Sequence, residues 1–472
     1  MMKKENQKYD VVIGLEIHAE LNTNSKLFCA CKNDAFTSPA NENTCAICLA
    51  KVDTSHKRTN RAAVEKTILA GTALGCTIND YCYFERKHYD YPDLPGGFQT
   101  TQDKKPICIG GAVTLKNGKT IRLNRIHLEE DAGKLIHDEV AGITLIDLNR
   151  AGVPLNEIVT EPDISSSAEA VELLEEIRSR LIFAGVANCR MEEGGMRCDV
   201  NVSLKPAGSK TLGDRTEHKN LNSFKMVARA IDAEIKRQTE LLDAGKPVAR
   251  ETRRWNDAAG KSTAMRSKEQ AHDYNYIPDP NLPEICLKEG INTTLPTLAH
   301  QYREQFTTEY KLPQYDAEVL TREFYICDFF TKSLELLKEP KKLSNWLMTD
   351  ILKLVTTAEI KITPKQFTDV IKLTDARKIT RQNAIVLFDE LWGKPDLDAE
   401  THAKKLKIFG GISRQEIETI LNELFAANPN AVADYATTPD KVINFFMGQT
   451  MKRTGGMADS VITKEIILSK LK

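Results

Sequence analysis

The sequence predicts an α+β protein whose first, mixed part is built around a largely antiparallel sheet and whose remaining parts are helical. Two segments, 9–21 and 196–204, alternate apolar and polar residues, which is typical of strands with one buried face. After about residue 290 the apolar residues recur at helical spacing, and four prolines between 278 and 296 mark the change. Because 472 residues exceed what one hydrophobic core usually organises, we expect several domains.

The first part also contains two predicted helices. One runs from Ser166 to Gly185, because Ser166 and Glu169 have the spacing of a capping box, apolar residues follow at helical intervals, and a glycine suits the end. The other runs from about Phe224 to Asp243. The first part therefore mixes strands and helices, and neither type of element is confined to one end.

The second half of the chain is predicted to be helical, with helices at 316–338 and 343–356 and a break at 409–411. From residue 401 onward the chain carries ten Lys/Arg against seven Asp/Glu, so its end is mildly basic. The predicted domains are a mixed domain at 1–293, a helical domain at 294–406 and a small helical tail at 407–472.

Charge and cysteine content predict a cytoplasmic protein. Sixty-five Lys/Arg nearly balance sixty-six Asp/Glu, so any nucleic-acid surface must be formed by a local group of basic residues. The first ten residues lack the apolar stretch of a secretory signal, and we find no apolar run long enough to span a bilayer. Eleven cysteines, an odd number scattered over a long chain, fit reduced thiols better than a disulfide framework.

Four cysteines form the strongest local motif. Cys29 and Cys31 make one close pair and Cys45 and Cys48 make another, which is the spacing of a tetrahedral zinc site. Four sulfurs would fill the coordination shell and leave no position for a substrate water, so the predicted zinc is structural. The alternative is four ordinary buried cysteines.

Acidic and imidazole side chains gather on the polar faces of predicted strands. If these strands are neighbours, the faces would merge into one site whose carboxylates suit Mg²⁺ and whose arginines suit phosphate. The alternative is that they are ordinary solvated faces. The residues are Glu16 and His18 on the first strand, Arg125, His127, Glu129 and Asp131 on a second, with Glu130 on its opposite side unless a bulge intervenes, and Arg197, Asp199 and Asn201 on a third.

No standard nucleotide-binding loop is present. The stretch 258–262, Ala-Ala-Gly-Lys-Ser, resembles the end of a P-loop, but Trp255 stands where that motif needs its first glycine. The loop 91–97, which contains Asp93, is a rigid turn followed by two glycines and is either a pocket wall or a plain connection. The basic segment 250–269 either contacts phosphates around Trp255 or is a solvated charge run.

Taken together, these segments resemble the B subunits of the bacterial aspartyl/glutamyl-tRNA amidotransferases, from about residue 9 to residue 470. The similar segments occur in the family's order: GLEIHAEL, Cys-x-Cys and Cys-x-x-Cys, YPDLP, RIHLEEDAGKL, NRAGVPLNEIVTEPD, MEEGGMRCDVNVS, HKNLNSF, ETRRW, MRSKEQAHDY and FFMGQTMKRT.

The resemblance implies a cradle-shaped first domain with a zinc knob at 29–48, a helical domain and a tail that grips tRNA. It implies a heterotrimer with two partners, a glutaminase that releases ammonia and a small third protein that wraps both larger ones. It further implies that the chain uses ATP to phosphorylate the side-chain carboxyl of Glu-tRNA(Gln) or Asp-tRNA(Asn), after which ammonia displaces the phosphate.

The resemblance also implies residue roles. Glu16, His18, Glu129 and Glu130 would hold Mg²⁺, and Arg125 would act with them in catalysis. Substrate or phosphate would be bound by Arg197, Asp199, Glu192 and Asp93, and the tail would contact tRNA through Lys452 and Arg453.

The chain departs from the family pattern at three places. Residues 50–60 replace a glycine- and proline-containing turn, Gly96 stands where the family has a lysine, and Asn275 replaces an arginine. Two alternatives to the active enzyme are therefore a noncatalytic, zinc-stabilised tRNA-binding or assembly protein, and a zinc-stabilised nucleic-acid-binding protein unrelated to amidation.

Overall fold

The structure is a computed structural model that divides into two compact units, Met1–Ala299 and His300–Lys472. No helix in the described part of the chain is both long enough and apolar enough to cross a membrane. The predicted separation of a tail domain at residue 407 stays a prediction. The structure describes residues 8–52, 56–89, 91–138, 140–265, 275–288, 291, 294–409, 412–454 and 456–471.

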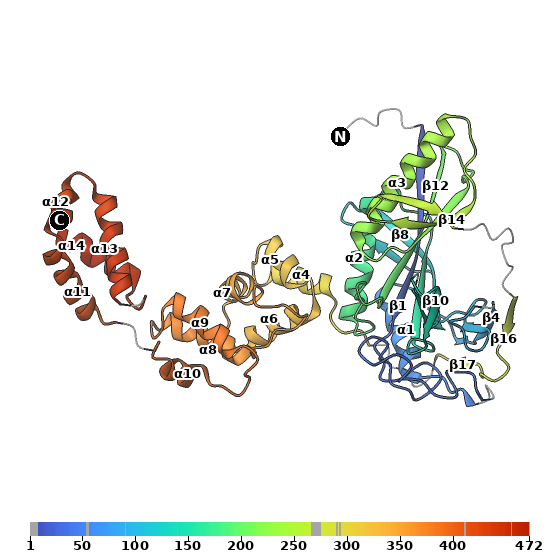
Figure 1. Cartoon of the computed structure of the whole chain (residues 1–472), viewed down its shortest axis with the longest axis horizontal. Helices are drawn as coiled ribbons and strands as arrows, with labels where there is room; N and C mark the ends of the chain where they lie inside the picture. Colours follow the sequence, from blue (N-terminus) through green and yellow to red (C-terminus); the bar gives the residue numbers. More distant parts are fainter. Residues whose placement is uncertain are drawn as a thin grey trace. The chain divides into compact units, whose positions relative to one another are not determined.

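A ten-stranded sheet is the centre of the first unit (Figure 1). Its main path runs β15-β14-β13-β12-β1-β11-β8-β6-β2, and β7 pairs with β8. Neighbouring strands are antiparallel except β13 and β14, so the predicted α+β class is confirmed. The strands are β1 (Tyr9–Glu20), β2 (Thr77–Ile78), β6 (Cys108–Ile109), β7 (Ala112–Thr114), β8 (Thr120–Glu130), β11 (Pro154–Thr160), β12 (Met196–Pro206), β13 (Arg215–Lys219), β14 (Glu251–Asn256) and β15 (Lys261–Ala264).

Three small sheets accompany the large one. One of them places β5 against β8, close to the polar face of the large sheet. They consist of β9 (Lys134–Asp138) with β10 (Ile143–Asp147), of β4 (Glu85–His88) between β5 (Phe98–Thr101) and β16 (Asn275–Pro278), and of β3 (Tyr81–Cys82) with β17 (Ile285–Cys286).

The predicted alternation of the first strand sets the orientation of the sheet. Ile13, Leu15 and Ile17 are almost completely buried, whereas the residues between them are half-buried. Three helices, α1 (Arg61–Ala73), α2 (Ser167–Phe183) and α3 (Phe224–Asp243), pack together beside the sheet (Figure 1). The other face of β1 carries the polar side chains of Glu16 and His18.

The helix predictions for the first unit are confirmed, with one difference at a cap. α3 has the predicted bounds. At the start of α2 the Ser166 hydroxyl accepts from the Glu169 N–H as expected. The Glu169 carboxylate, however, accepts from the N–H of Ser165 and from Lys119. Only half of the predicted capping box therefore forms, because a nearby lysine competes for the carboxylate.

The second unit is helical, as predicted, but two helix predictions are wrong in detail. The expected helix at 316–338 is interrupted after Leu320, where the Thr321 hydroxyl donates to the Ala317 carbonyl and competes with continuation of the helix. The expected helix at 343–356 begins earlier, at Pro340, and changes to a π-helix. The elements are α4 (Ala299–Thr308), α5 (Gln314–Leu320), α6 (Phe324–Leu336), α7 (Pro340–Trp346), η2 (Leu347–Ile351), α8 (Pro364–Asp375), α9 (Arg381–Leu391), α10 (Ala399–Lys405), α11 (Arg414–Ala427), α12 (Pro429–Ala433), η3 (Asp434–Ala436), α13 (Pro439–Arg453) and α14 (Ser460–Leu471).

Candidate active site

The four predicted zinc ligands lie together in an irregular knob. The sulfur atoms of Cys29, Cys31, Cys45 and Cys48 are all within 4.8 Å of one another. A hydrogen bond from Cys29 lowers the pKa of the Cys48 thiol to about 5, and the Cys45 N–H adds to this. A thiolate is the form that binds zinc, and four sulfurs complete a tetrahedral shell. The cluster therefore has the ligand set of a structural zinc site.

The register of the sheet aligns polar residues of four neighbouring strands in a row. His18 of β1 lies opposite Arg197 of β12 on one side and opposite Glu157 of β11 on the other. Glu157 lies opposite His127 of β8. Because β11 separates β1 from β8, the polar faces predicted from the sequence merge only through this strand.

A second row runs parallel to the first. Glu16 of β1 lies opposite Asp199 of β12 and opposite Val159 of β11. Val159 lies opposite Arg125 of β8, whose guanidinium is 3.7 Å from the Asp103 carboxylate. The apolar Val159 thus separates Arg125 from the carboxylate of Glu16.

Four side chains of these rows, together with Glu129 of β8, form a carboxylate–imidazole cluster. His18 Nε2 is 3.4 Å from Glu157 Oε2 and 3.8 Å from both Glu16 Oε1 and Glu129 Oε1. His127 Nε2 is 3.5 Å from Glu157 Oε2 and 3.6 Å from Glu129 Oε2. Within the cluster, two overlapping groups place their ligand atoms within 4.8 Å: Glu16, His18 and Glu157, and His127, Glu129 and Glu157.

The electrostatics of the cluster follow from burial and mutual proximity. Burial disfavours the charge on Glu16 and, with the neighbouring Glu157 carboxylate, raises its pKa. Burial would lower the pKa of His127, but the carboxylates of Glu157 and Glu129 outweigh it and raise the pKa to about 9. Burial would raise the pKa of Glu157, but His127 and His18 outweigh it and hold that pKa well below its ordinary value. A cation entering the cluster would replace protons on the imidazoles.

Sequence reasoning did not assign Glu157, although a single oxygen of this carboxylate lies within 3.5 Å of both imidazoles. In the segment NRAGVPLNEIVTEPD, Glu157 follows the polar Asn156 and precedes the apolar Ile158 and Val159, so no alternation of apolar and polar residues marks its face. Its role depends on the place of β11 between β1 and β8, which alternation within one strand does not reveal.

A cavity of about 320 Å³ lies on the β12–β14 side of the cluster, and we call it the cationic pocket. Lys219 forms ion pairs with Asp199 and, at 3.0 Å, with Glu217. Burial opposes its charge, but these two carboxylates raise its pKa. Arg254 is exposed, and its side chain has no ion pair or hydrogen bond within the described part of the chain. The pocket is lined in part by Arg197, Asp199, Lys219, Asn220 and Arg254.

Arg197 also borders a second acidic group. Its guanidinium donates to Asp131, which lies 3.5 Å from Arg150. Burial would raise the pKa of Asp131, but both arginines and this hydrogen bond outweigh it and lower the pKa. Burial and the charge of Asp131 raise the pKa of Glu20 to about 8. Arg197 is therefore held by a carboxylate at the point where the cluster meets the pocket.

Glu130 lies apart from the cluster. Strand alternation directs it to the other side of β8, where it accepts from the Thr100 N–H at 3.0 Å and from Lys57 Nζ at 3.3 Å. Lys57, Glu130, Asp93 and Gly96 line a cavity of about 30 Å³. The magnesium role predicted for Glu130 and the phosphate role predicted for Asp93 stay predictions.

The remaining predicted residues lie outside this centre. Glu192 is exposed in the turn before β12. Lys452 and Arg453 occupy the last turn of α13, where Arg453 forms an ion pair with Glu423. In the basic segment the Trp255 ring is buried, so it offers no exposed stacking surface, which corrects that part of the prediction. Residues 266–269 of this segment, and MRSKEQAHDY after its first residue, are outside the described residues.

Comparison with known proteins identifies the class to which this fold and site belong. Residues 11–293 match the family model described as the GatB/GatE catalytic domain, and residues 328–471 match the model described as the GatB domain. The chain is 42% identical to the aspartyl/glutamyl-tRNA(Asn/Gln) amidotransferase B subunit of Thermoanaerobacter pseudethanolicus, covering 98% of this chain and 99% of the relative. It is 42% identical to the corresponding protein of Caldicellulosiruptor saccharolyticus, with 98% and 99% covered. The value for Agathobacter rectalis is 40%, with 98% and 100% covered. The chain belongs to the GatB family, the B subunits of the aspartyl/glutamyl-tRNA amidotransferases.

Proposed function

We propose that the chain is the ATP-dependent amidating component of an aminoacyl-tRNA amidotransferase that converts Glu-tRNA(Gln), Asp-tRNA(Asn) or both. Its relatives are named as amidotransferases of these tRNAs. The observation that carries the proposal is the continuity of one sheet face, on which a carboxylate–imidazole cluster adjoins a cationic pocket. The acidic cluster suits a metal ion, and the adjoining cationic pocket suits the triphosphate that the metal binds and a carboxylate acceptor.

The chemistry requires activation of the substrate carboxylate. A side-chain oxygen of the aminoacyl group attacks the γ-phosphorus of ATP, and the bond to ADP breaks. The acyl phosphate then reacts with ammonia: a C–N bond forms, inorganic phosphate leaves, and the nitrogen loses a proton. Phosphoryl transfer needs positioning and positive charge more than covalent participation by the protein.

The residues of the sheet face divide these tasks. The carboxylates of Glu16, Glu129 and Glu157 offer oxygen ligands to a divalent cation, in two overlapping groups of which one includes His18 and the other His127. Mg²⁺, when bound there, would neutralise charge on the phosphate oxygens. We assign Lys219, Arg254 and Arg197 to the triphosphate, because they are the cations of the adjoining pocket.

The partners belong to the same proposal. Ammonia would come from a glutaminase partner, a small third protein would complete the heterotrimer, and the basic end of α13 would contact tRNA. The noncatalytic alternative relied on the missing lysine at position 96 and the missing arginine at position 275. In favour of the enzyme, Lys57, whose ammonium group is bound to Glu130, also lines the cavity that Gly96 lines.

Reconstitution tests the proposal. The chain is co-expressed with the glutaminase and the small third protein, and supplied with glutamine, ATP, Mg²⁺ and either Glu-tRNA(Gln) or Asp-tRNA(Asn). We expect ADP and amidated tRNA in equal amounts. Binding of tRNA without formation of either product would support the noncatalytic alternative.

A further inference from the structure

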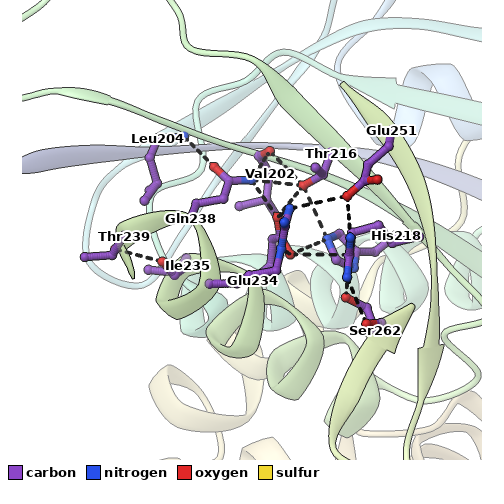
Figure 2. A network of polar contacts seen from close by, with 12 residues as sticks. Val202, Leu204, Thr216, His218, Glu234, Ile235, Gln238, Thr239, Glu251 and Ser262 are labelled. Atoms are coloured by element: carbon purple, nitrogen blue, oxygen red, sulfur yellow. Dashed lines mark hydrogen bonds and ion pairs between the residues drawn. The ribbon is translucent and has the colours of Figure 1, made fainter. Parts of the chain in front are cut away.

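A buried polar network joins helix α3 to strands β13 and β14 (Figure 2). It lies on the face of these strands opposite the cationic pocket. Successive residues of a strand point to opposite faces. Lys219 and Arg254 are paired in register and line the pocket, so the preceding pair, His218 and Arg253, points to the other face. The two residues beneath the pocket are thus covalent neighbours of the two cations within it.

Glu234 of α3 is the centre of this network (Figure 2). Its side chain is completely buried. Thr216 donates to it at 2.7 Å, Gln238 at 2.8 Å and Arg237 at 2.7 Å. Its other oxygen lies 3.3 Å from His218 Nε2. One carboxylate therefore joins its own helix to strand β13.

Arg253 extends the network to the edge of the sheet. Its guanidinium is 3.9 Å from Glu234 and donates to the side chain of Ser262 at 2.8 Å and to the Ser262 carbonyl at 2.9 Å. It also forms an ion pair with Glu251 of its own strand. Helix α3 and strands β13, β14 and β15 are thereby connected through charged groups.

The two strands that carry the pocket cations are paired over a short stretch. The parallel pairing of β13 with β14 extends over only four residue pairs, from Thr216 with Glu251 to Lys219 with Arg254. Directly after Lys219 the backbone of Asn220 adopts a φ of 68°, and the Asn220 side chain donates to the Trp255 carbonyl at 3.1 Å. The Thr252 hydroxyl of β14 also donates to the Glu217 carboxylate of β13 at 2.7 Å. Glu234 adds a connection between the two strands on the opposite, buried face, through His218 and Arg253.

A buried charge is a costly way to hold strands together. Apolar side chains of similar volume often stabilise a fold as well or better, whereas a charged network fixes one arrangement of its members. Burial would raise the pKa of Glu234, but hydrogen bonds from His218 and Arg237 outweigh it and lower the pKa, so the carboxylate is ionised at neutral pH. Positional precision, more than stability, is what such a network provides.

We propose that Glu234 is a positioning residue for the nucleotide: by holding His218 and Arg253, it fixes the separation of Lys219 and Arg254 across the cationic pocket. This inference rests on the proposed function in one respect, the assignment of the ATP triphosphate to that pocket. Glu234 itself does not line the pocket and acts only through the two strands.

The test uses Glu234→Gln in the assembled enzyme, with Asp316→Asn as the matched control. Asp316 is also a buried carboxylate, bonded to Ser344 at 2.8 Å and to Lys341 at 2.8 Å, but it belongs to the helical unit. We expect both variants to lower the melting temperature. Only Glu234→Gln should raise KM for ATP, by about fivefold or more, with KM for glutamine and kcat changed less than about twofold.

Two further variants separate the possible failures. Arg254→Ala should itself raise KM for ATP, and Glu234→Gln should have a smaller effect in that background because both changes act on one contact. If Arg254→Ala leaves KM unchanged, the pocket is not the triphosphate site, and both that assignment and the positioning role are overturned, whereas amidation itself is judged by the reconstitution. If Arg254→Ala raises KM and Glu234→Gln does not, only the positioning role is overturned. Should Glu234→Gln not fold, Thr216→Val removes one bond to Glu234 and keeps the charges; an unchanged KM for ATP in that variant would also overturn the role.

Discussion

Replacing Glu157 by glutamine is the sharpest perturbation of the candidate active site. One oxygen of Glu157 lies 3.4 Å from the imidazole of His18 and 3.5 Å from that of His127. The amide keeps the shape of the side chain but removes its charge. We expect two effects, one on the stability of the metal-free protein and one on the reaction, and they can be measured separately.

The stability effect follows from the pKa of His127. A folded pKa of about 9 against 6.5 in the unfolded chain contributes about 2.5 kcal/mol at pH 7. Because the folded pKa is the higher one, this stability is fully present below pH 6.5 and is lost as the pH rises through 9. In the Glu157→Gln variant the Glu129 carboxylate still raises the pKa of His127, so only part of this stability is lost. We expect the free energy of unfolding to fall by about 1–2 kcal/mol at pH 7 and by almost nothing above pH 9.

The reaction should suffer more. Removing a group that only orients a metal ligand costs about 10–100-fold in activity, so loss of a carboxylate within the ligand set should cost at least about 100-fold. ADP formation and amidated tRNA are measured against Mg²⁺ concentration, and the unfolding free energy is measured with a chelator present. Glu161→Gln is the matched control, since Glu161 follows the same strand, is bonded to Asn124 and lies outside the cluster. Amidation by Glu157→Gln at the rate of the Glu161→Gln control would refute the assignment of the cluster as the metal site.

Four further predictions test other parts of the molecule. Glu16→Gln should abolish amidated product while the activity of the glutaminase partner stays measurable; product at the parent rate would exclude the strand from the site. Cys45→Ser should reduce bound zinc, measured by elemental analysis, from about one ion per chain to a small fraction; an unchanged zinc content would show that the knob is not the zinc site. Lys452→Ala should weaken tRNA binding equally for both tRNAs and reduce the slope of log affinity against log salt by about 1, and an unchanged slope would mean no phosphate contact. Phe446→Ala removes a fully buried ring from the core of α11, α13 and α14 and should lower the unfolding free energy of that core by about 3–5 kcal/mol, measured by denaturant titration; a loss under about 1 kcal/mol would contradict the packing.

Local patterns predicted the orientation of the first strand because alternation depends only on the backbone. The side chains of Ile13, Leu15 and Ile17 are buried, and those of Glu16 and His18 face the cluster, as the period of two requires. The two cysteine pairs were equally predictable, since short spacing brings each pair together whatever the rest of the fold does.

The composition of the cluster was harder to predict because it depends on the order of the strands. β11 lies between β1 and β8, and this placement supplies Glu157 and excludes direct pairing of β1 with β8. For Glu130, the sequence predicted the face of the strand but not the partner. Alternation placed it on the far side of β8, but Lys57, its partner there, precedes α1 by a few residues and is more than seventy positions away in the sequence.

Strand order also determines the polarity of the site. The side chains of β1, β11 and β8 contribute carboxylates and imidazoles, whereas β13 and β14 contribute Lys219 and Arg254. β12 lies between the two groups and carries one residue of each sign, Arg197 and Asp199, and each is paired with an opposite charge from a neighbouring element. A metal-bound triphosphate has the complementary polarity, with its positive metal suited to the carboxylates and its negative phosphates suited to the cations. Its orientation on the sheet would therefore follow from the order of the strands, and reversing the charge of one residue, such as Lys219→Glu, should weaken binding without reversing that orientation.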